Sequence, residues 1–109
     1  NRENIMAKNM NGLMKQAQQM QQKMAMVQKE LEARELDISS GGGAVKIKIN
    51  GKQELLEIKI DKEGVDPSDV EGLEELVLTA VNQAVKESQD MVSGAMSKVT
   101  GGLSIPGLF

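Results

Sequence analysis

The feature that most constrains this chain is a heptad repeat of apolar residues near its N-terminus. Steps of four and three residues separate its apolar positions, which are Met6, Met10, Leu13, Ala17, Met20, Met24, Val27 and Leu31. This period, without proline and interrupted only by Gly12, predicts an α-helix from about Lys8 to Arg34. At 1.5 Å per residue the helix is roughly 40 Å long, which exceeds the core of one small domain. We therefore expect part of it to project, or to pack against another long helix of this chain or of a partner.

The middle of the chain changes from a helical to an alternating pattern. Apolar and polar residues alternate over residues 36–39 and again over residues 45–49. Three consecutive glycines, Gly41–Gly43, lie between these runs and suit a corner, because glycine adopts backbone angles that other residues avoid. A third alternating run ends at Ile60, so the sequence predicts a three-stranded antiparallel meander.

Asn50 and Gly51 lie between the second and third strands and favour a two-residue type I′ turn. In that register Ile49 pairs with Lys52 and Val45 lies opposite Leu56. The apolar face of the hairpin then comprises Val45, Ile47, Ile49, Leu56, Ile58 and Ile60. The opposite, solvated face comprises Lys46, Lys48, Glu57 and Lys59.

A second long helix is predicted from Pro67 to about Lys98. Asp66 supplies an N-cap carboxylate and Pro67 suits the first helical position, while Gly101 and Gly102 end the helix. The expected fold class is α+β, with one domain over residues 1–109. Residues 1–7 are expected to be disordered or an added remnant, and residues 101–109 to form a flexible tail.

The residue types that are missing exclude whole chemistries. The chain has no His, Cys, Trp or Tyr, so it lacks the commonest general base and metal ligand and any thiol nucleophile. Its single aromatic residue, Phe109, does not make a surface for base stacking. We expect no enzyme activity, no catalytic residues, no cofactor and no metal. No apolar run approaches the ~20 residues that span a bilayer, and we expect a cytoplasmic protein without a membrane partner or a small-molecule substrate.

The charge is unevenly distributed along the chain. Residues 1–29 carry a net charge of +4 and the remainder −7, and no acidic residue occurs between Asn4 and Lys29. Basic residues with neighbouring glutamines form an outward stripe opposite the heptad seam, namely Lys8, Lys15, Lys23 and Lys29. Such a stripe is either a phosphate-contacting face or the ordinary solvated surface of a coiled coil.

Methionine is concentrated in the first helix, which holds six of the eight. Most of the six lie on the seam and suit the interior of a helix pair, but Met14 and Met26 lie off it. A deformable methionine surface also suits a protein-interaction scaffold or a small chaperone-like dimer. This second function stays open beside phosphate binding.

The ordered set of motifs resembles the YbaB/EbfC family of bacterial nucleoid-associated proteins. The resemblance runs from about Met10 to the C-terminus. It comprises the Met/Gln-rich helix, Gly41-Gly42-Gly43 with Val45 and Lys46, Asn50-Gly51, Ile58 with Ile60-Asp61, Asp66-Pro67, Leu73-Glu74-Glu75-Leu76, Ala80-Val81-Asn82-Gln83-Ala84, Met96 and Pro106-Gly107-Leu108-Phe109.

The resemblance implies a tweezer-like homodimer whose paired long helices accept duplex DNA with limited sequence preference. It also implies roles in nucleoid organisation and gene regulation, at the bacterial nucleoid. The assignment of DNA contact to Lys8, Lys15, Lys23 and Lys29 comes from the charge pattern and not from the family.

Overall fold

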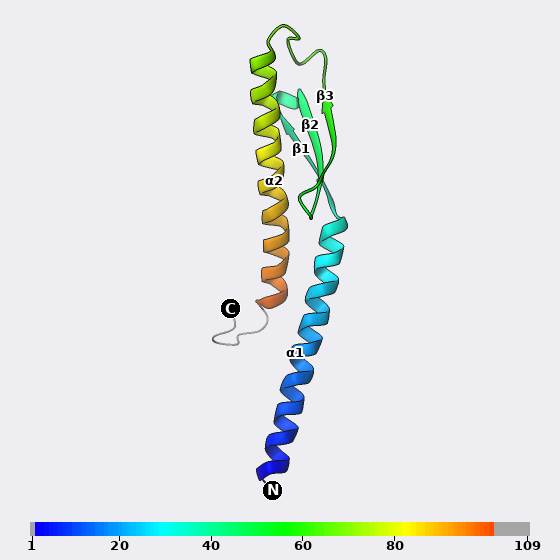
Figure 1. Cartoon of the computed structure of the whole chain (residues 1–109), viewed down its shortest axis with the longest axis vertical. Helices are drawn as coiled ribbons and strands as arrows, with labels where there is room; N and C mark the ends of the chain where they lie inside the picture. The colour runs from blue at the N-terminus through cyan, green and yellow to red at the C-terminus, as the bar shows by residue number, and fades with distance from the viewer. Residues whose placement is uncertain (1, 102–109) are drawn as a thin grey trace.

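The protein is an elongated rod in which the C-terminal helix packs along a small sheet and the N-terminal helix extends away from one end of that sheet (Figure 1). The computed structural model describes residues 2–101 and measures 82 × 22 × 16 Å. Its elements are α1 (Arg2–Ala33), β1 (Glu35–Ser40), a 3-10 turn (Gly41–Gly43), β2 (Val45–Asn50), β3 (Leu55–Ile60) and α2 (Val70–Thr100). The predicted α+β fold, with its antiparallel meander between two long helices, is confirmed.

Helix α1 begins at Arg2, six residues before the predicted start at Lys8. Nothing between residues 2 and 8 breaks a helix, so the helix continues through most of the segment that we expected to be disordered or extraneous. Of the tail, Gly101 lies in a turn and residues 102–109 lie outside the described residues. Across the described residues, neither long helix is apolar enough over a sufficient length to cross a membrane.

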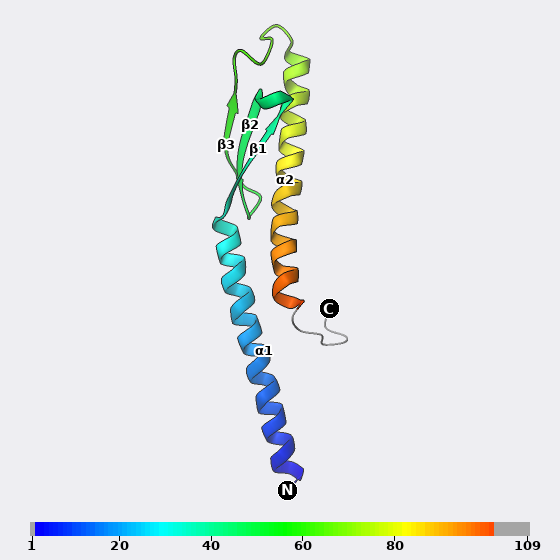
Figure 2. The same cartoon turned by 180° about the vertical axis from the view of Figure 1, so that it is seen from behind.

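Only the C-terminal part of α1, from Met20 onward, is packed. Met20, Met24 and Val27 are half-buried and Leu31 is buried, whereas residues 6–19 are exposed. The packed part lies beside the C-terminal half of α2, and the rest extends beyond the end of α2 (Figures 1 and 2). We call residues 2–19 of α1 the arm. The expectation that this helix projects from the body is confirmed.

The predicted hairpin register is wrong by four residues. Val45 lies opposite Ile60 rather than Leu56, Ile47 lies opposite Ile58, and a bulge follows before Ile49 pairs with Leu55. Because the error is an even number of residues, side chains at positions 58 and 60 keep the face that the alternation predicts.

The longer turn has its cause in the side chain of Asn50. The Asn50 Oδ1 atom accepts hydrogen bonds from the backbone N–H groups of Lys52 and Glu54, at 2.9 and 3.1 Å. Gln53 takes the left-handed conformation with φ 63°. These bonds stabilise a loop longer than the two-residue turn that the Asn-Gly pair favours.

Gly51 is required for packing rather than for a left-handed turn. A Cβ atom at this position would stand 1.9 Å from the backbone oxygen of Leu31. The last turn of α1 therefore rests directly on the hairpin backbone. This contact fixes the direction in which the arm leaves the sheet.

The core lies between the sheet and α2. Val45, Ile47 and Ile49 of β2 are almost completely buried, together with Ile38 of β1. The facing stripe of α2 consists of small residues at a spacing of four, Ala80, Ala84 and Ser88, which are also buried. Small side chains allow the helix axis to approach the sheet closely, and α2 covers β1 and β2.

Helix α2 begins at Val70, three residues after the predicted start at Pro67, and continues without a break to Thr100. Asp69 is the N-cap, because its Oδ1 atom accepts a 3.0 Å hydrogen bond from the Gly72 N–H. Asp66 instead closes a preceding turn, in which its carboxylate accepts from both the N–H and the hydroxyl of Ser68. Asp66 and Asp69 are both suited to the N-cap position, and it is Asp69 that caps the helix.

Candidate nucleic-acid interface

The four lysines singled out in the sequence lie on α1, and all four are exposed. Lys8, Lys15 and Lys29 are separated by whole heptads and share the side of the helix opposite the seam that packs against α2. Seven residues span about 10 Å along a helix. Lys23 lies to one side of this row. The structure thus presents a line of cations on the outer side of α1, for which we use the name lysine face.

Within residues 6–101 the lysine face forms no ion pair, and the ion pairs all lie on the sheet. Only Lys29 has carboxylates nearby, since it lines a shallow pocket together with Glu32 and Glu54. The first acidic residues after Lys29 are Glu30 and Glu32, at the end of α1 next to the sheet. A cation without a carboxylate partner is free to bind a phosphate without first breaking an ion pair.

Acidic residues concentrate at the opposite end of the rod, in the segment from Asp61 to Glu75 (Figure 1). Hydrogen bonds from the hydroxyl and N–H of Ser68 hold the pKa of the Asp66 carboxyl below its ordinary value. Residues 61–75 contain seven acidic residues and one lysine, so this end of the molecule does not suit a polyanionic ligand. The lysine face lies away from this end.

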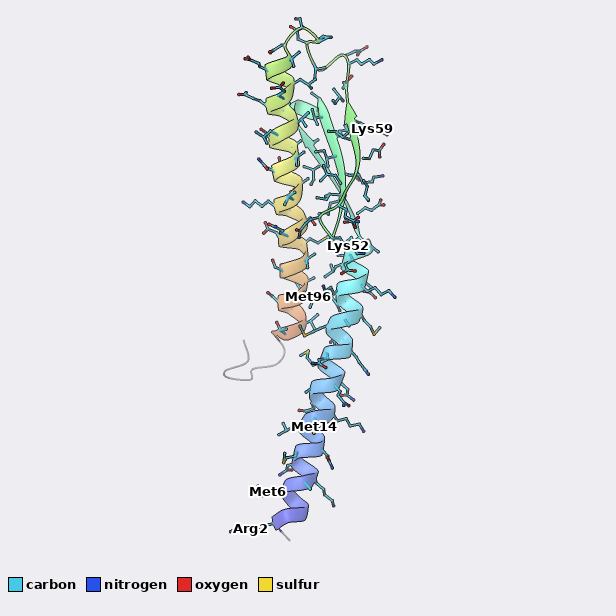
Figure 3. All side chains as sticks on the ribbon, viewed as in Figure 1. Arg2, Met6, Met14, Lys52, Lys59 and Met96 are labelled. Atoms are coloured by element: carbon cyan, nitrogen blue, oxygen red, sulfur yellow. The ribbon has the colours of Figure 1, made fainter. Side chains whose placement is uncertain are left out.

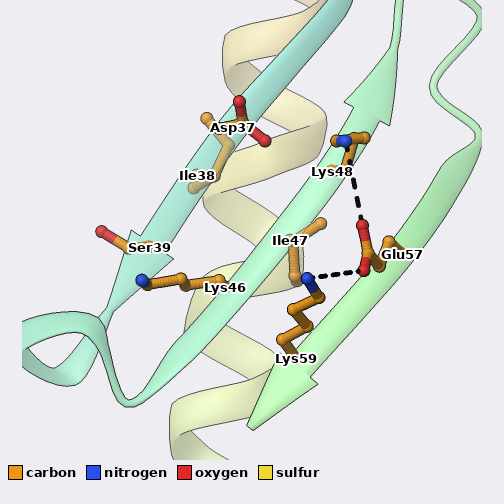
Figure 4. A pocket seen from close by; sticks show the side chains of 8 residues that line it. All are labelled: Asp37, Ile38, Ser39, Lys46, Ile47, Lys48, Glu57 and Lys59. Carbon is orange, nitrogen blue, oxygen red and sulfur yellow. Dashed lines mark ion pairs between the residues drawn. The ribbon is translucent and has the colours of Figure 1, made fainter. Parts of the chain in front are cut away.

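The solvent face of the sheet holds a second group of lysines (Figure 4). A shallow pocket of about 380 Å³ is lined there by Lys46, Lys48 and Lys59 together with carboxylates. Glu57 contacts Lys59 at 3.2 Å and Lys48 at 3.8 Å. The negative charges of Glu35, Asp37 and Glu57 balance the three lysines. This face therefore attracts a polyanion much less strongly than the lysine face does.

One apolar surface was missed by the sequence pattern. Ile58 and Ile60 project on the core side of β3 yet are 46% and 41% exposed, because α2 covers only the other two strands. Helix α2 also carries a groove of about 480 Å³ lined mainly by apolar side chains. Its lining residues are Val70, Leu73, Glu74, Val77, Leu78 and Val81. We call this combined area the β3–α2 surface.

Alternation predicted that Ile58 and Ile60 would face the core, and they do. It gives no information on whether a second layer covers that face. The signal that was available is the excess of apolar positions on α2, where Val70 and Leu78 lie outside the stripe that packs on the sheet and are 58% and 61% exposed.

Comparisons with known proteins agree with this fold. Residues 6–103 match the model of the YbaB/EbfC DNA-binding family. A nucleoid-associated protein of Alkaliphilus metalliredigens is 52% identical over 103 residues, covering 94% of this chain and 90% of the relative. A nucleoid-associated protein of Clostridium novyi is 54% identical over 101 residues, covering 93% and 89%. The chain therefore belongs to the YbaB/EbfC DNA-binding family.

A solved structure supports the architecture as well. The crystal structure of an uncharacterized protein from Helicobacter pylori matches with a TM-score of 0.70 at 21% sequence identity. The match covers 82% of this chain and 94% of that protein. At this identity the likeness concerns the fold.

Proposed function

We propose that this chain binds duplex DNA as a homodimer, through phosphate contacts of the lysine face, with limited sequence preference. In this role it contributes to nucleoid organisation and gene regulation, in association with the bacterial nucleoid. The observation that carries the proposal is the exposed row formed by Lys8, Lys15, Lys23 and Lys29 on α1, none of which forms an ion pair within residues 6–101. Family membership supports DNA as the ligand.

The contact is electrostatic and passive. Lysine ammonium groups contact phosphates as point charges and carry no base-reading geometry, so sequence preference arises from DNA shape. Neutralising about four phosphates releases condensed counterions, and affinity then falls roughly as the inverse 3.6 power of the salt concentration.

The β3–α2 surface supports the homodimer. It combines the exposed apolar face of β3, at Ile58 and Ile60, with an apolar groove on α2. A two-fold axis would place Ile58 and Ile60 of each copy against the groove of the other. The same contact would then form twice in the dimer. Exposed apolar patches of this kind on a small protein mark an interface.

The test is fluorescence anisotropy on several unrelated duplexes between about 25 and about 300 mM salt. The variant Lys8→Gln, Lys15→Gln, Lys23→Gln, Lys29→Gln should lose most of its affinity and most of its salt dependence. A matched control removes four lysines of the sheet and of the loop that follows it, as Lys46→Gln, Lys48→Gln, Lys59→Gln, Lys62→Gln, and should keep a slope near the original. Circular dichroism and mass measurements check that helicity and dimerisation are unchanged.

The competing function is a scaffold that grips apolar segments of other proteins with its methionines. The exposure of Met14 and Met26 on α1 favours it. Apolar binding persists or strengthens with salt, whereas phosphate binding weakens. Equal DNA binding by the lysine variant and its control would remove the lysine face from the mechanism, and absent DNA binding would favour the scaffold.

A further inference from the structure

The heptad stripe of α1 continues past the point where its partner helix ends. Met20, Met24 and Val27 are half-buried where α1 runs beside α2. Toward the N-terminus the same stripe carries Met6 and Leu13, which are 64% and 65% exposed. Figure 3 shows Met96 of α2 beside α1, with Met14 and Met6 progressively farther along the arm. The apolar stripe is therefore covered over half its length and uncovered over the other half.

The chain itself contains a segment that matches this uncovered stripe. Helix α2 ends at Thr100, beside α1, and the residues that follow Gly101 have no charged side chain. They include four large apolar residues, which are Leu103, Ile105, Leu108 and Phe109. Pro106 cannot continue the interior of a helix, which favours an extended course for this segment.

The lengths also correspond. Residues 102–109, when extended, reach about 27 Å at 3.3–3.6 Å per residue. The arm, residues 2–19, measures about 27 Å at 1.5 Å per residue. A segment that starts at the end of α2 can therefore follow the arm along its whole length.

We propose that residues 102–109 dock along the exposed stripe of the arm of the same chain, formed by Met6, Met10 and Leu13 with Met14 at its edge. The contact extends the α1–α2 interface beyond Gly101. Methionine suits such a site because its flexible thioether adapts to irregular apolar shapes and makes favourable contacts with aromatic rings, and Phe109 is the one aromatic residue of the chain.

This occupant leaves the lysine face free. Lys8 and Lys15 lie on the opposite side of the arm from the stripe, so a docked tail and a bound duplex do not compete for the same side chains. The docking is therefore independent of the proposed DNA binding, and failure of one does not imply failure of the other.

Two properties of the chain allow a direct test. It contains no cysteine, so Ser104→Cys places a single nitroxide label on the tail, and its methionine methyl groups provide NMR signals along the arm. Chains that carry the label and ¹³C-methyl methionine are refolded with an excess of unlabelled chains, so that each observed chain has an unlabelled partner. The Met6, Met10 and Met14 signals should lose most of their intensity and recover when the nitroxide is reduced.

The stripe variant Met6→Gln, Met10→Gln, Leu13→Gln should restore the Met14 signal, because glutamine preserves length and helix propensity but not the apolar contact. The matched control Met26→Gln makes the same change on the outer side of α1 and should leave the broadening intact. Unbroadened arm signals, or equal broadening of Met14 in the stripe variant, would overturn the proposal. Broadening only when labelled and ¹³C-bearing chains are different molecules would also overturn it, by assigning the tail to the partner's arm.

Discussion

The buried hydroxyl of Ser88 donates a 2.7 Å hydrogen bond to the backbone carbonyl of Asn50, 38 residues earlier in the chain. The bond joins the middle of α2 to the turn between β2 and β3. The same turn supports the end of α1 through the close approach of Gly51 to Leu31. Both long helices are thus positioned by one short loop, and the direction of the arm depends on it.

Ser88→Ala should lower the free energy of unfolding by about 1 kcal/mol. The loss is small for a buried hydrogen bond, because the Asn50 carbonyl still accepts a 3.1 Å hydrogen bond from the N–H of Gln53. Urea denaturation followed by circular dichroism measures the change. Ser93→Ala, an exposed position on the same helix, should leave stability within about 0.5 kcal/mol. Equal effects of the two substitutions would contradict a structural role for the buried bond.

Gly51→Ala should be strongly destabilising, by about 1–3 kcal/mol or more, because the added methyl meets the backbone of Leu31 and cannot be accommodated by a side-chain rotation. Gly94→Ala provides the opposite control. No atom lies within 4 Å of a Cβ at position 94. Replacing this helical glycine with alanine should therefore raise the free energy of unfolding by about 1 kcal/mol. Thermal unfolding of the two variants should move in opposite directions.

Leu78→Glu should convert the proposed dimer to a monomer. Leu78 is exposed on the β3–α2 surface, and a carboxylate there would be buried without a partner in a symmetric interface. Sedimentation equilibrium measures the mass. Met26→Glu, which places the same charge on an equally exposed position of α1, should not change the mass. A Leu78→Glu protein that remains dimeric would show that the interface lies elsewhere.

Ser68→Ala should raise the pKa of Asp66 toward its ordinary value, because the hydroxyl that stabilises the carboxylate is removed while the N–H of residue 68 remains. The pKa is lowered in the folded state, so the contribution of Asp66 to stability is present above its ordinary pKa and is lost as the pH falls through the folded value. A ¹³C NMR titration of the Asp66 carboxyl gives the pKa. Ser93→Ala should leave it unchanged.

The sequence contained enough information to place the elements and their faces, since periods of 3.5 and 2 residues depend on local backbone geometry. The register of the hairpin and the first residue of α2 were not predictable in the same way. Asn50 and Asp66 each carry a side chain that bonds to the backbone two residues later, and such bonds compete with the standard turn and cap. The strength of each alternative depends on contacts with distant residues.

The two surfaces of interest differ in how far the sequence revealed them. The charge pattern predicted the lysine face, and the structure places Lys8, Lys15, Lys23 and Lys29 exposed on one projecting helix. Their contact with DNA stays a prediction. The β3–α2 surface was not anticipated, because alternation assigns Ile58 to a face but does not report that no layer of the same chain covers it.

The separation of charge along the 82 Å axis makes the net charge of −3 a poor guide to what the arm encounters. At physiological ionic strength, fields decay over about 8 Å, so a polyanion at the arm is screened from the acidic segment at the far end. At lower ionic strength the field extends farther and acts on both ends with opposite sign. We expect the resulting torque to turn the arm toward a polyanion before contact.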